Sequence, residues 1–255
     1  MITDSAQLRN LLVQRRSDDS YRTWGYHSRV SPAHRYVCVP VPKVACTTTK
    51  TVLRSLEGLP PSDRIHDEGD RLADFSIDQN IDMLRSPAWL RFSFVRNPYA
   101  RLYSAYKSKI GNTWEHQYDW LQRQIRDAYD YPIQDGVRTG MINFDDFVRF
   151  VAESSDPRVG TDGHLAPQVA IVQQDCIDYD TIGRFETFQT DFTAILTRLD
   201  ASAAVVDQVT KIINPTPYAP LTAVYRRALA ATVYALYEAD FETWGYPRRS
   251  WLAED

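Results

Sequence analysis

Short apolar runs alternate along the chain with stretches in which apolar residues recur every three or four positions. Residues 36–41 and 92–95 are short, mainly apolar runs of strand length, and residues 179–185 are a third strand candidate. The predicted helices cover 4–16, 46–56, 77–85, a segment that opens at Pro98, 114–130, 143–152, 187–199 and 221–239. Strands that alternate with helices predict an α/β fold with a central, mostly parallel sheet flanked by helices in three layers.

Three segments are predicted to be irregular. Residues 60–74 are polar and rich in turn formers, and residues 214–220 contain three prolines. A loop with Pro157, Gly160 and Gly163 leads to a histidine at 164. A length of 255 residues suffices for one large domain, so we expect a single domain over 1–255 with an N-terminal helical extension over 1–30.

Composition and charge exclude several classes of protein. The net charge of −4 gives no general attraction to nucleic acid or to an anionic membrane. Three cysteines are an odd count without metal-ligand spacing, which indicates neither a disulfide framework nor a zinc site. The sequence shows no signal-peptide profile and no apolar stretch of membrane-spanning length. We therefore expect a soluble protein in a reducing, cytoplasmic environment, with neither nucleic acid nor a membrane as its partner.

A candidate anion site follows the first strand. Lys43 precedes a predicted helix that opens with Cys46 and three threonines and continues with Lys50. A helix N-terminus directs free N–H groups and the positive end of its dipole toward an anion. The Walker A glycines and the G-x-G-x-x-G pattern of dinucleotide sites are both missing here. A threonine-capped helix beside a solvated lysine explains this segment equally well.

A second candidate follows the next strand. Arg96 stands where that strand ends, and an arginine can bind a phosphate with two parallel hydrogen bonds. Ser104 comes eight residues later, about two turns into the predicted helix. Taken alone, Ser104 reads as a small packing residue among its aromatic neighbours.

Together the two segments resemble a known family. Pro-Lys-Val-Ala-Cys-Thr from Pro42, then Arg-Asn-Pro-Tyr-x-Arg-Leu-x-Ser-Ala-Tyr from Arg96, resemble the signatures with which sulfotransferases bind 3′-phosphoadenosine 5′-phosphosulfate (PAPS). The closest match is the carbohydrate sulfotransferase branch, which includes the HNK-1 and chondroitin 4-O enzymes. A third stretch, from His164 to the Phe-Glu-Thr that begins at Phe185, is also similar to that branch. The resemblance covers residues 36–246 and implies a P-loop-like three-layer fold.

The match is not complete. Leu165 replaces a tryptophan of the family pattern, Arg184 replaces a lysine, and Cys176 stands where Golgi members carry a cysteine pair. These departures concern the compartment and the acceptor more than the reaction.

The resemblance also implies roles for individual residues. The first loop would hold the 5′-phosphosulfate through Lys43, Ala45, Cys46, Thr47 and Thr48. Arg96 and Ser104 would hold the 3′-phosphate. PAPS would be the co-substrate and 3′-phosphoadenosine 5′-phosphate (PAP) the product. No metal is expected, because a sulfuryl group carries less negative charge than a phosphoryl group.

Sulfuryl transfer should proceed in line, with charge building on the leaving oxygen. We expect Lys43 to stabilise that oxygen and a histidine to act as base toward the acceptor hydroxyl, because its unperturbed pKa lies near neutrality. His164 is the first candidate, His66 the second and Glu186 the third. A surface or structural role is the alternative for any lone histidine.

The acceptor is a hydroxyl whose carrier the sequence does not define. A glycan is expected by family analogy, while a lipid headgroup or a small metabolite stays open. A P-loop-type nucleotide kinase is the main alternative among enzymes, and a non-catalytic PAP- or glycan-binding module is the alternative from another class. The oligomeric state cannot be read from the sequence.

Overall fold

The computed structural model describes residues 4–16, 25, 27–111, 116–211 and 219–252. The chain divides into two compact units. Met1–Arg96 with Gln168–Thr216 form one, here called the sheet unit, and Asn97–Pro167 with Pro217–Asp255 form the other, the helical unit. The expectation of a single domain stays a prediction.

The sheet unit is built on four strands in the order β1-β2-β3-β6. They are β1 (Arg29–Ser31), β2 (Tyr36–Val39), β3 (Leu90–Val95) and β6 (Thr181–Arg184). β2, β3 and β6 run parallel, and only β1 is antiparallel to its neighbour β2. The three parallel strands are those that the apolar runs predict, whereas the three-residue β1 is too short to give a pattern.

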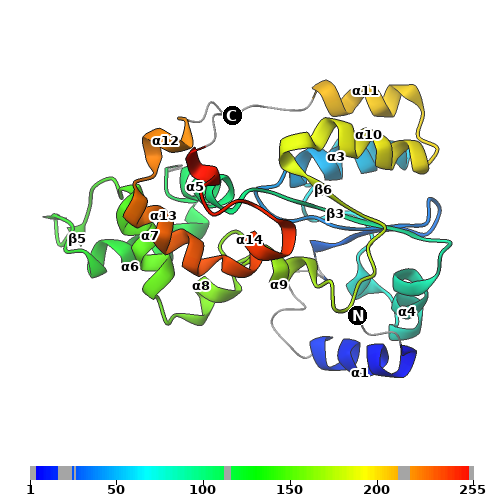
Figure 1. Cartoon of the computed structure of the whole chain (residues 1–255), viewed down its shortest axis with the longest axis horizontal. Coiled ribbons are helices and arrows are strands. Elements are labelled where there is room, and N and C mark those ends of the chain that lie inside the picture. The colour runs from blue at the N-terminus through cyan, green and yellow to red at the C-terminus, as the bar shows by residue number, and fades with distance from the viewer. Residues whose placement is uncertain (1–3, 17–24, 26, 112–115, 212–218, 253–255) are drawn as a thin grey trace. The chain divides into compact units, whose positions relative to one another are not determined.

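Helices cover both faces of this sheet (Figure 1). On one side lie α3 (Cys46–Leu56), α10 (Phe188–Arg198) and α11 (Ala203–Lys211), and on the other α1 (Ser5–Arg16) and α4 (Ile77–Arg85). The short elements of this unit are η1 (Leu72–Asp74), α9 (Gln168–Val172) and η3 (Phe185–Thr187). The predicted three-layer α/β fold is therefore confirmed, and α3 and α4 have the predicted bounds.

Aromatic rings fill the space between the sheet and α10. Phe94 on β3 packs against Phe188 and Phe192, with ring centroids 4.8 and 5.5 Å away. Its register partner on β6 is Gly183. A Cβ atom at Gly183 would lie 2.5 Å from the Phe94 ring, so only glycine lets this ring lie flat on the neighbouring strand.

The carboxyl ends of β2 and β3 are fastened to each other. The Ser93 hydroxyl donates a 2.6 Å hydrogen bond to the carbonyl of Val39, and both residues are fully buried. The chain leaves β2 toward Lys43 and leaves β3 at Arg96. Parallel pairing thus delivers the two candidate anion segments to one edge of the sheet.

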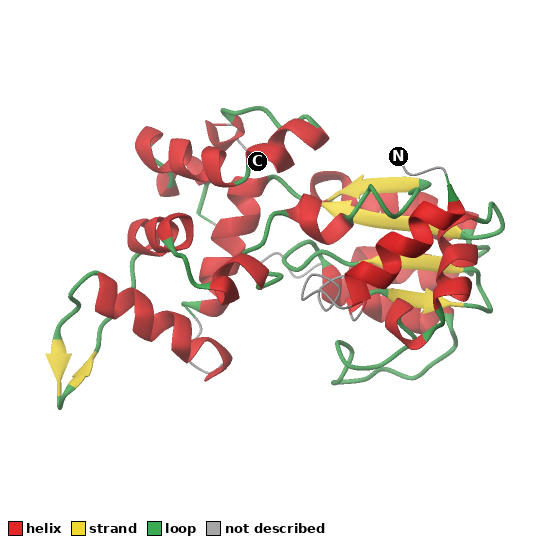
Figure 2. Cartoon of the chain, turned by 90° about the horizontal axis from the view of Figure 1, so that it is seen from below, coloured by secondary structure: helices red, strands yellow, loops and turns green. Residues whose placement is uncertain are grey.

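The helical unit packs its helices around aromatic side chains. It contains α5 (Pro98–Lys109), η2 (His116–Tyr118), α6 (Asp119–Ala128), α7 (Phe144–Glu153), α8 (Pro157–Thr161), α12 (Leu221–Val224), α13 (Arg227–Leu236), α14 (Glu238–Trp244) and η4 (Ser250–Leu252). A hairpin of β4 (Ile133–Gln134) and β5 (Val137–Arg138) stands out from α6 (Figure 2). Tyr225 contacts both Tyr99 and Phe144 edge-on in the core, with centroids 5.1 and 5.3 Å away.

Two expectations for this unit are wrong. The helix predicted over 221–239 is three shorter helices, because Tyr225 and Tyr237 adopt non-helical backbone. Their buried hydroxyls donate to the carbonyls of Tyr99 and Leu165, at 2.9 and 2.6 Å, and these tertiary bonds override the apolar periodicity. The loop expected around Pro157 and Gly160 contains α8 instead, with Pro157 in the first turn. The proline-rich segment over 214–220 lies largely outside the described residues.

Candidate functional site

The loop between β2 and α3 is strained without containing glycine. The Val44 amide donates to the Val41 carbonyl at 3.2 Å and closes a turn with Pro42 at its second position. Lys43, at the third position, has φ 67°, and Ala45 has φ 50°. Each left-handed non-glycine residue costs on the order of 1–3 kcal/mol. This strain lets the backbone curl as anion-binding loops do, although the Walker glycines are missing.

The N-terminus of α3 is left open to an anion. Ala45 occupies the N-cap, has no side chain that accepts hydrogen bonds, and is followed by a first turn without acidic residues. The positive end of the helix dipole is therefore not neutralised by the helix itself. Thr47 is exposed, whereas Thr48 is buried with only 8% of its surface accessible. A bound oxyanion can replace the missing cap.

Arg96 joins this loop from the end of β3. Its guanidinium donates a 3.1 Å hydrogen bond to the Lys43 carbonyl and stacks 3.9 Å from the centre of the Phe185 ring. The Gln168 side chain clamps the Arg96 backbone, accepting from its N–H at 2.9 Å and donating to its C=O at 2.8 Å. Lys43 and Arg96, one from each predicted anion-binding segment, are therefore in direct contact.

His66 lies beside the same helix terminus. Its Nε2 is 3.2 Å from the Thr47 hydroxyl, and its Nδ1 is 3.3 Å from the Lys50 ammonium. Arg29, which is 5% exposed, donates to the carbonyls of Ile65 and His66 at 3.1 and 2.9 Å. A buried arginine thus holds the irregular segment that presents this histidine.

Lys50 is a buried cation in this cluster. Burial and, to a smaller extent, the nearby positive charge of Arg29 together lower its pKa to about 8. Near neutral pH the ammonium form still predominates. A positive charge therefore lies against the imidazole of His66, one turn inside α3.

His164 belongs to the helical unit and has a carboxylate partner. Its Nδ1 lies 2.8 Å from the Tyr118 hydroxyl and 3.2 Å from an Asp162 oxygen, and the Tyr118 hydroxyl donates to the other Asp162 oxygen at 2.8 Å. Burial alone would raise the pKa of Asp162, but the hydrogen bonds and charge of His164, with the bond from Tyr118, lower it below its usual value. Asp162 is therefore an anion that favours a proton on Nδ1.

The loop that carries His164 is fixed from two directions. The buried Arg101 donates to the carbonyls of Gly163 and Ala166 at 2.7 and 2.9 Å. The buried Tyr237 hydroxyl donates to the Leu165 carbonyl. These bonds use main-chain oxygens, so they hold the loop without engaging the imidazole of His164.

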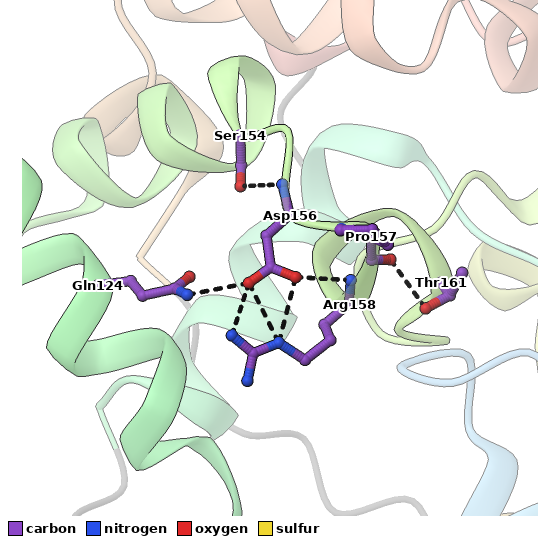
Figure 3. A network of polar contacts seen from close by, with 6 residues as sticks. All are labelled: Gln124, Ser154, Asp156, Pro157, Arg158 and Thr161. Atoms are coloured by element: carbon purple, nitrogen blue, oxygen red, sulfur yellow. Dashed lines mark hydrogen bonds and ion pairs between the residues drawn. The ribbon is translucent and has the colours of Figure 1, made fainter.

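Upstream of that loop, Asp156 starts α8. Its carboxylate accepts from the Gln124 amide of α6 at 2.9 Å and from the Arg158 amide and guanidinium (Figure 3). The hydrogen bond from the Arg158 side chain is the main reason that the pKa of Asp156 is lowered. The network joins α6 to the first turn of α8, which leads directly into Asp162.

The predicted site residues are divided between the units. The sheet unit contains Lys43, Ala45, Cys46, Thr47, Thr48, His66, Arg96 and Glu186, and the helical unit contains Ser104 and His164. Ser104 is buried on α5, and Glu186 is exposed in η3. The roles assigned to all of them stay predictions.

Sequence reasoning assigned no role to several residues of these clusters. Gln168 and Phe185 lie inside the third motif, but their contacts with Arg96 link positions far apart in the chain. Arg29 and Asp162 carry no local signal at all, and the aromatic segment around Tyr118 gives no sign of its contact with His164. Only the spacing of the third motif could have drawn attention to Gln168 and Phe185.

The described part of the chain shows neither a metal-ligand cluster nor a membrane-spanning helix. No group of three or more histidine, cysteine or acidic residues there could hold a metal ion. Among the same residues, no helix is both long and apolar enough to cross a bilayer. Neither finding tests the expected lack of a metal or the expected compartment, which stay predictions.

Comparison with known proteins decides the family. Residues 26–247 match the model of the Sulfotransferase family. The chain belongs to this family. The match spans both units and all three motifs, so the resemblance read from the sequence is confirmed.

Individual relatives point to one branch. Carbohydrate sulfotransferase 14 of Danio rerio is 30% identical over 234 residues, which are 87% of this chain and 62% of that protein. Its Homo sapiens counterpart is 28% identical, over 89% of this chain and 61% of the relative. Carbohydrate sulfotransferase 11 of Rattus norvegicus is 25% identical, over 90% and 69%. The chain thus spans about three fifths of the length of the first two relatives. No solved structure matches the chain significantly.

Proposed function

We propose that this protein transfers a sulfuryl group from PAPS to a hydroxyl group of a carbohydrate. One observation carries the proposal. The guanidinium of Arg96 and the backbone of Lys43 are hydrogen-bonded at the edge where two parallel strands end. Lys43 and Arg96, two cationic residues from separate family motifs, therefore lie at the same sheet edge. The binding of one bisphosphorylated nucleotide requires such an arrangement.

The residues at this edge suit the anionic donor. Backbone N–H groups of α3, threonine hydroxyls and the cations Lys43 and Arg96 are hydrogen-bond donors, which phosphate and sulfate oxygens need. The first turn of α3 contains no carboxylate that would repel an anion. Lys43, Ala45, Cys46, Thr47 and Thr48 would hold the 5′-phosphosulfate, and Arg96 with Ser104 the 3′-phosphate.

PAPS supplies a sulfuryl group activated by a phosphate leaving group. Lys43 would oppose the negative charge that develops on the leaving oxygen, assisted by the α3 N-terminus. The left-handed backbone at Lys43 and Ala45 fixes the direction of these hydrogen-bonding groups before PAPS binds. Such preorganisation costs no reorganisation at the moment of transfer.

The two histidines differ in their fitness as the base. Nδ1 of His66 faces the Lys50 ammonium, which disfavours a second proton on that ring. Nδ1 of His164 faces Asp162 and Tyr118, which favours the tautomer with its proton on Nδ1 and its basic lone pair on Nε2. When Nε2 takes up a proton, the Asp162 carboxylate stabilises the imidazolium. These surroundings support His164 as the base and His66 as a residue that orients Thr47.

A carbohydrate acceptor is proposed because the relatives at 25–30% identity are named carbohydrate sulfotransferases. The family match favours this function over a nucleotide kinase. A non-catalytic binding module is distinguished by turnover alone, because such a module would keep the nucleotide contacts.

The test combines binding with transfer. Calorimetry should give a Kd for PAP that is unaffected by EDTA and far lower than that for ATP, and ³⁵S-labelled PAPS should label a panel of glycans but not phenols. Lys43→Ala should lower turnover by about 100-fold or more, as the loss of one charge-stabilising donor does, and Lys107→Ala, an exposed lysine, serves as control. Tight ATP binding that needs Mg²⁺ would favour the kinase. PAP binding with no labelled acceptor would favour the binding module.

A further inference from the structure

The helical unit has a cavity of about 430 Å³ that the proposed mechanism does not use. It is lined by Tyr99, Arg227, Ala230, Ala231, Arg248, Arg249, Trp251 and Leu252. Small-molecule sites have volumes of roughly 300–1,000 Å³. The cavity is therefore large enough for a saccharide unit.

Two walls form the cavity. Arg227, Ala230 and Ala231 lie on one face of α13, at positions i, i+3 and i+4, and the two alanines leave room beside the helix. The other wall is the segment over 248–252, which ends in η4. The Tyr99 hydroxyl ties the walls together, because it lies 2.7 Å from the carbonyl of Arg248 and 3.3 Å from that of Ala230.

The lining is strongly basic although the chain has a net charge of −4. Three arginines line it and no carboxylate does. Across the described residues, none of these three forms a salt bridge, whereas their neighbour Arg226 pairs with Asp145 at 3.5 Å. The Arg248 guanidinium stacks on the Tyr234 ring of α13 at 4.6 Å, which holds its position while its N–H groups can still donate.

We propose that this cavity binds a negatively charged saccharide unit of the acceptor, through a carboxylate or sulfate group. Arginine donates paired hydrogen bonds to such groups, and guanidiniums from both walls can share one ligand. Trp251 adds an indole beside them, which offers an apolar face to a sugar ring. A neutral saccharide would leave the arginines without anionic partners. This acceptor role rests on the proposed transferase function.

Calorimetry on the full chain tests the proposal with three hexasaccharides of equal length. The first contains uronate units, the second is its carboxyl-reduced neutral form, and the third is the reduced form carrying O-sulfates. Arg248→Ala and Arg249→Ala should each weaken binding of a charged hexasaccharide by about tenfold, the loss of one charge-assisted hydrogen bond. Arg249→Lys should lose less, and the neutral form should bind weakly to every variant. The first and third ligands show whether carboxylate or sulfate is preferred.

Arg123→Ala is the matched control, because this exposed arginine lies in the same unit and outside the cavity. Equal losses in the control and cavity variants would mean a diffuse charge effect and would overturn the proposal, as would equal binding of charged and neutral hexasaccharides. Melting temperatures check that the variants fold, and Arg249→Lys keeps the test valid should an alanine variant unfold. If the native chain binds PAP and turns over a small neutral acceptor but shows no preference for charged glycans, the proposed saccharide site is contradicted and the transferase function is not. Loss of PAP binding in the native chain would instead contradict the transferase.

Discussion

The guanidinium of Arg96 donates to the carbonyl of Lys43, at a distance of 3.1 Å. The bond connects residues of two family motifs that lie 53 positions apart in the chain. It also fixes the loop carbonyl of a residue whose backbone is left-handed. Arg96 therefore has two roles: it is a candidate phosphate ligand, and it braces the loop that presents the Lys43 ammonium.

Arg96→Lys should lose both roles although it keeps the charge. An ammonium cannot reproduce the planar stack on Phe185 while it donates to Lys43 and to a phosphate. We expect the Kd for PAP to rise by about 10- to 100-fold, the cost of one or two charge-assisted bonds. Calorimetry measures this, with the exposed Arg198→Lys as control. An unchanged Kd for PAP would show that Arg96 is structural only.

The two histidine variants should separate binding from turnover. His164→Ala should lower kcat by about 10²–10⁴, the usual contribution of a general base, with an unchanged Kd for PAP. His66→Ala should mainly weaken PAP binding, because the Thr47 hydroxyl loses its partner. Single-turnover kinetics with ³⁵S-labelled PAPS and direct PAP titration report the two quantities. The opposite pattern would make His66 the base.

Asp162→Asn tests whether the carboxylate orients His164. The amide removes the charge that stabilises the imidazolium and changes the hydrogen bond to Nδ1. We expect kcat to fall with little change in KM, and we expect the acidic limb of the pH–rate profile, which belongs to the base, to move to lower pH, because the imidazole becomes a weaker base without the carboxylate charge. Tyr118→Phe, which removes only the hydroxyl, should have a smaller effect. An unchanged pH profile would indicate a purely structural carboxylate.

The local sequence predicts helix bounds correctly where the ends of the helix are set by residues next to them in the chain. The helix over 46–56 starts after a turn and ends before Gly58, and the helix over 77–85 begins with a Ser76 capping box, so both have the expected bounds. The break at Tyr225 could not be predicted, because it results from a hydrogen bond to the Tyr99 carbonyl more than one hundred residues away.

The same distinction applies to the candidate site. The family motifs point to Lys43 and Arg96, and parallel strands bring their segments together. The motifs do not reveal Lys50 beside His66, or Asp162 beside His164, because those pairs arise from tertiary packing. Only the folded structure shows that His164 lies beside a carboxylate, which favours its protonation, and that His66 lies beside an ammonium, which opposes it.

Gly183 should tolerate no side chain. A Cβ there would lie 2.5 Å from the Phe94 ring, which is itself packed against Phe188. We expect Gly183→Ala to lower the free energy of unfolding by about 1–3 kcal/mol, the usual cost of overpacking. Gly160→Ala is the control, because nothing lies within 4 Å of its Cβ position. Chemical denaturation measures both, and equal stabilities would show that the Phe94 ring moves aside without strain.

The buried charge of Lys50 should appear as a pH dependence of stability. Its pKa is about 8 in the folded chain, lowered by burial and by Arg29, against 10.5 for a free side chain. Between these values the unfolded chain binds more protons than the folded one, so this lysine makes the free energy of unfolding rise as the pH increases from about 8 to about 10.5. Lys50→Met should remove that rise and be relatively more stable at neutral pH, because no ammonium is desolvated. The measurement is urea denaturation at closely spaced pH values, with the exposed Lys107→Met as control. If Lys50→Met and the native chain show the same slope over this range, the pKa of Lys50 is not lowered in solution, and its ammonium is hydrated instead of being buried against His66.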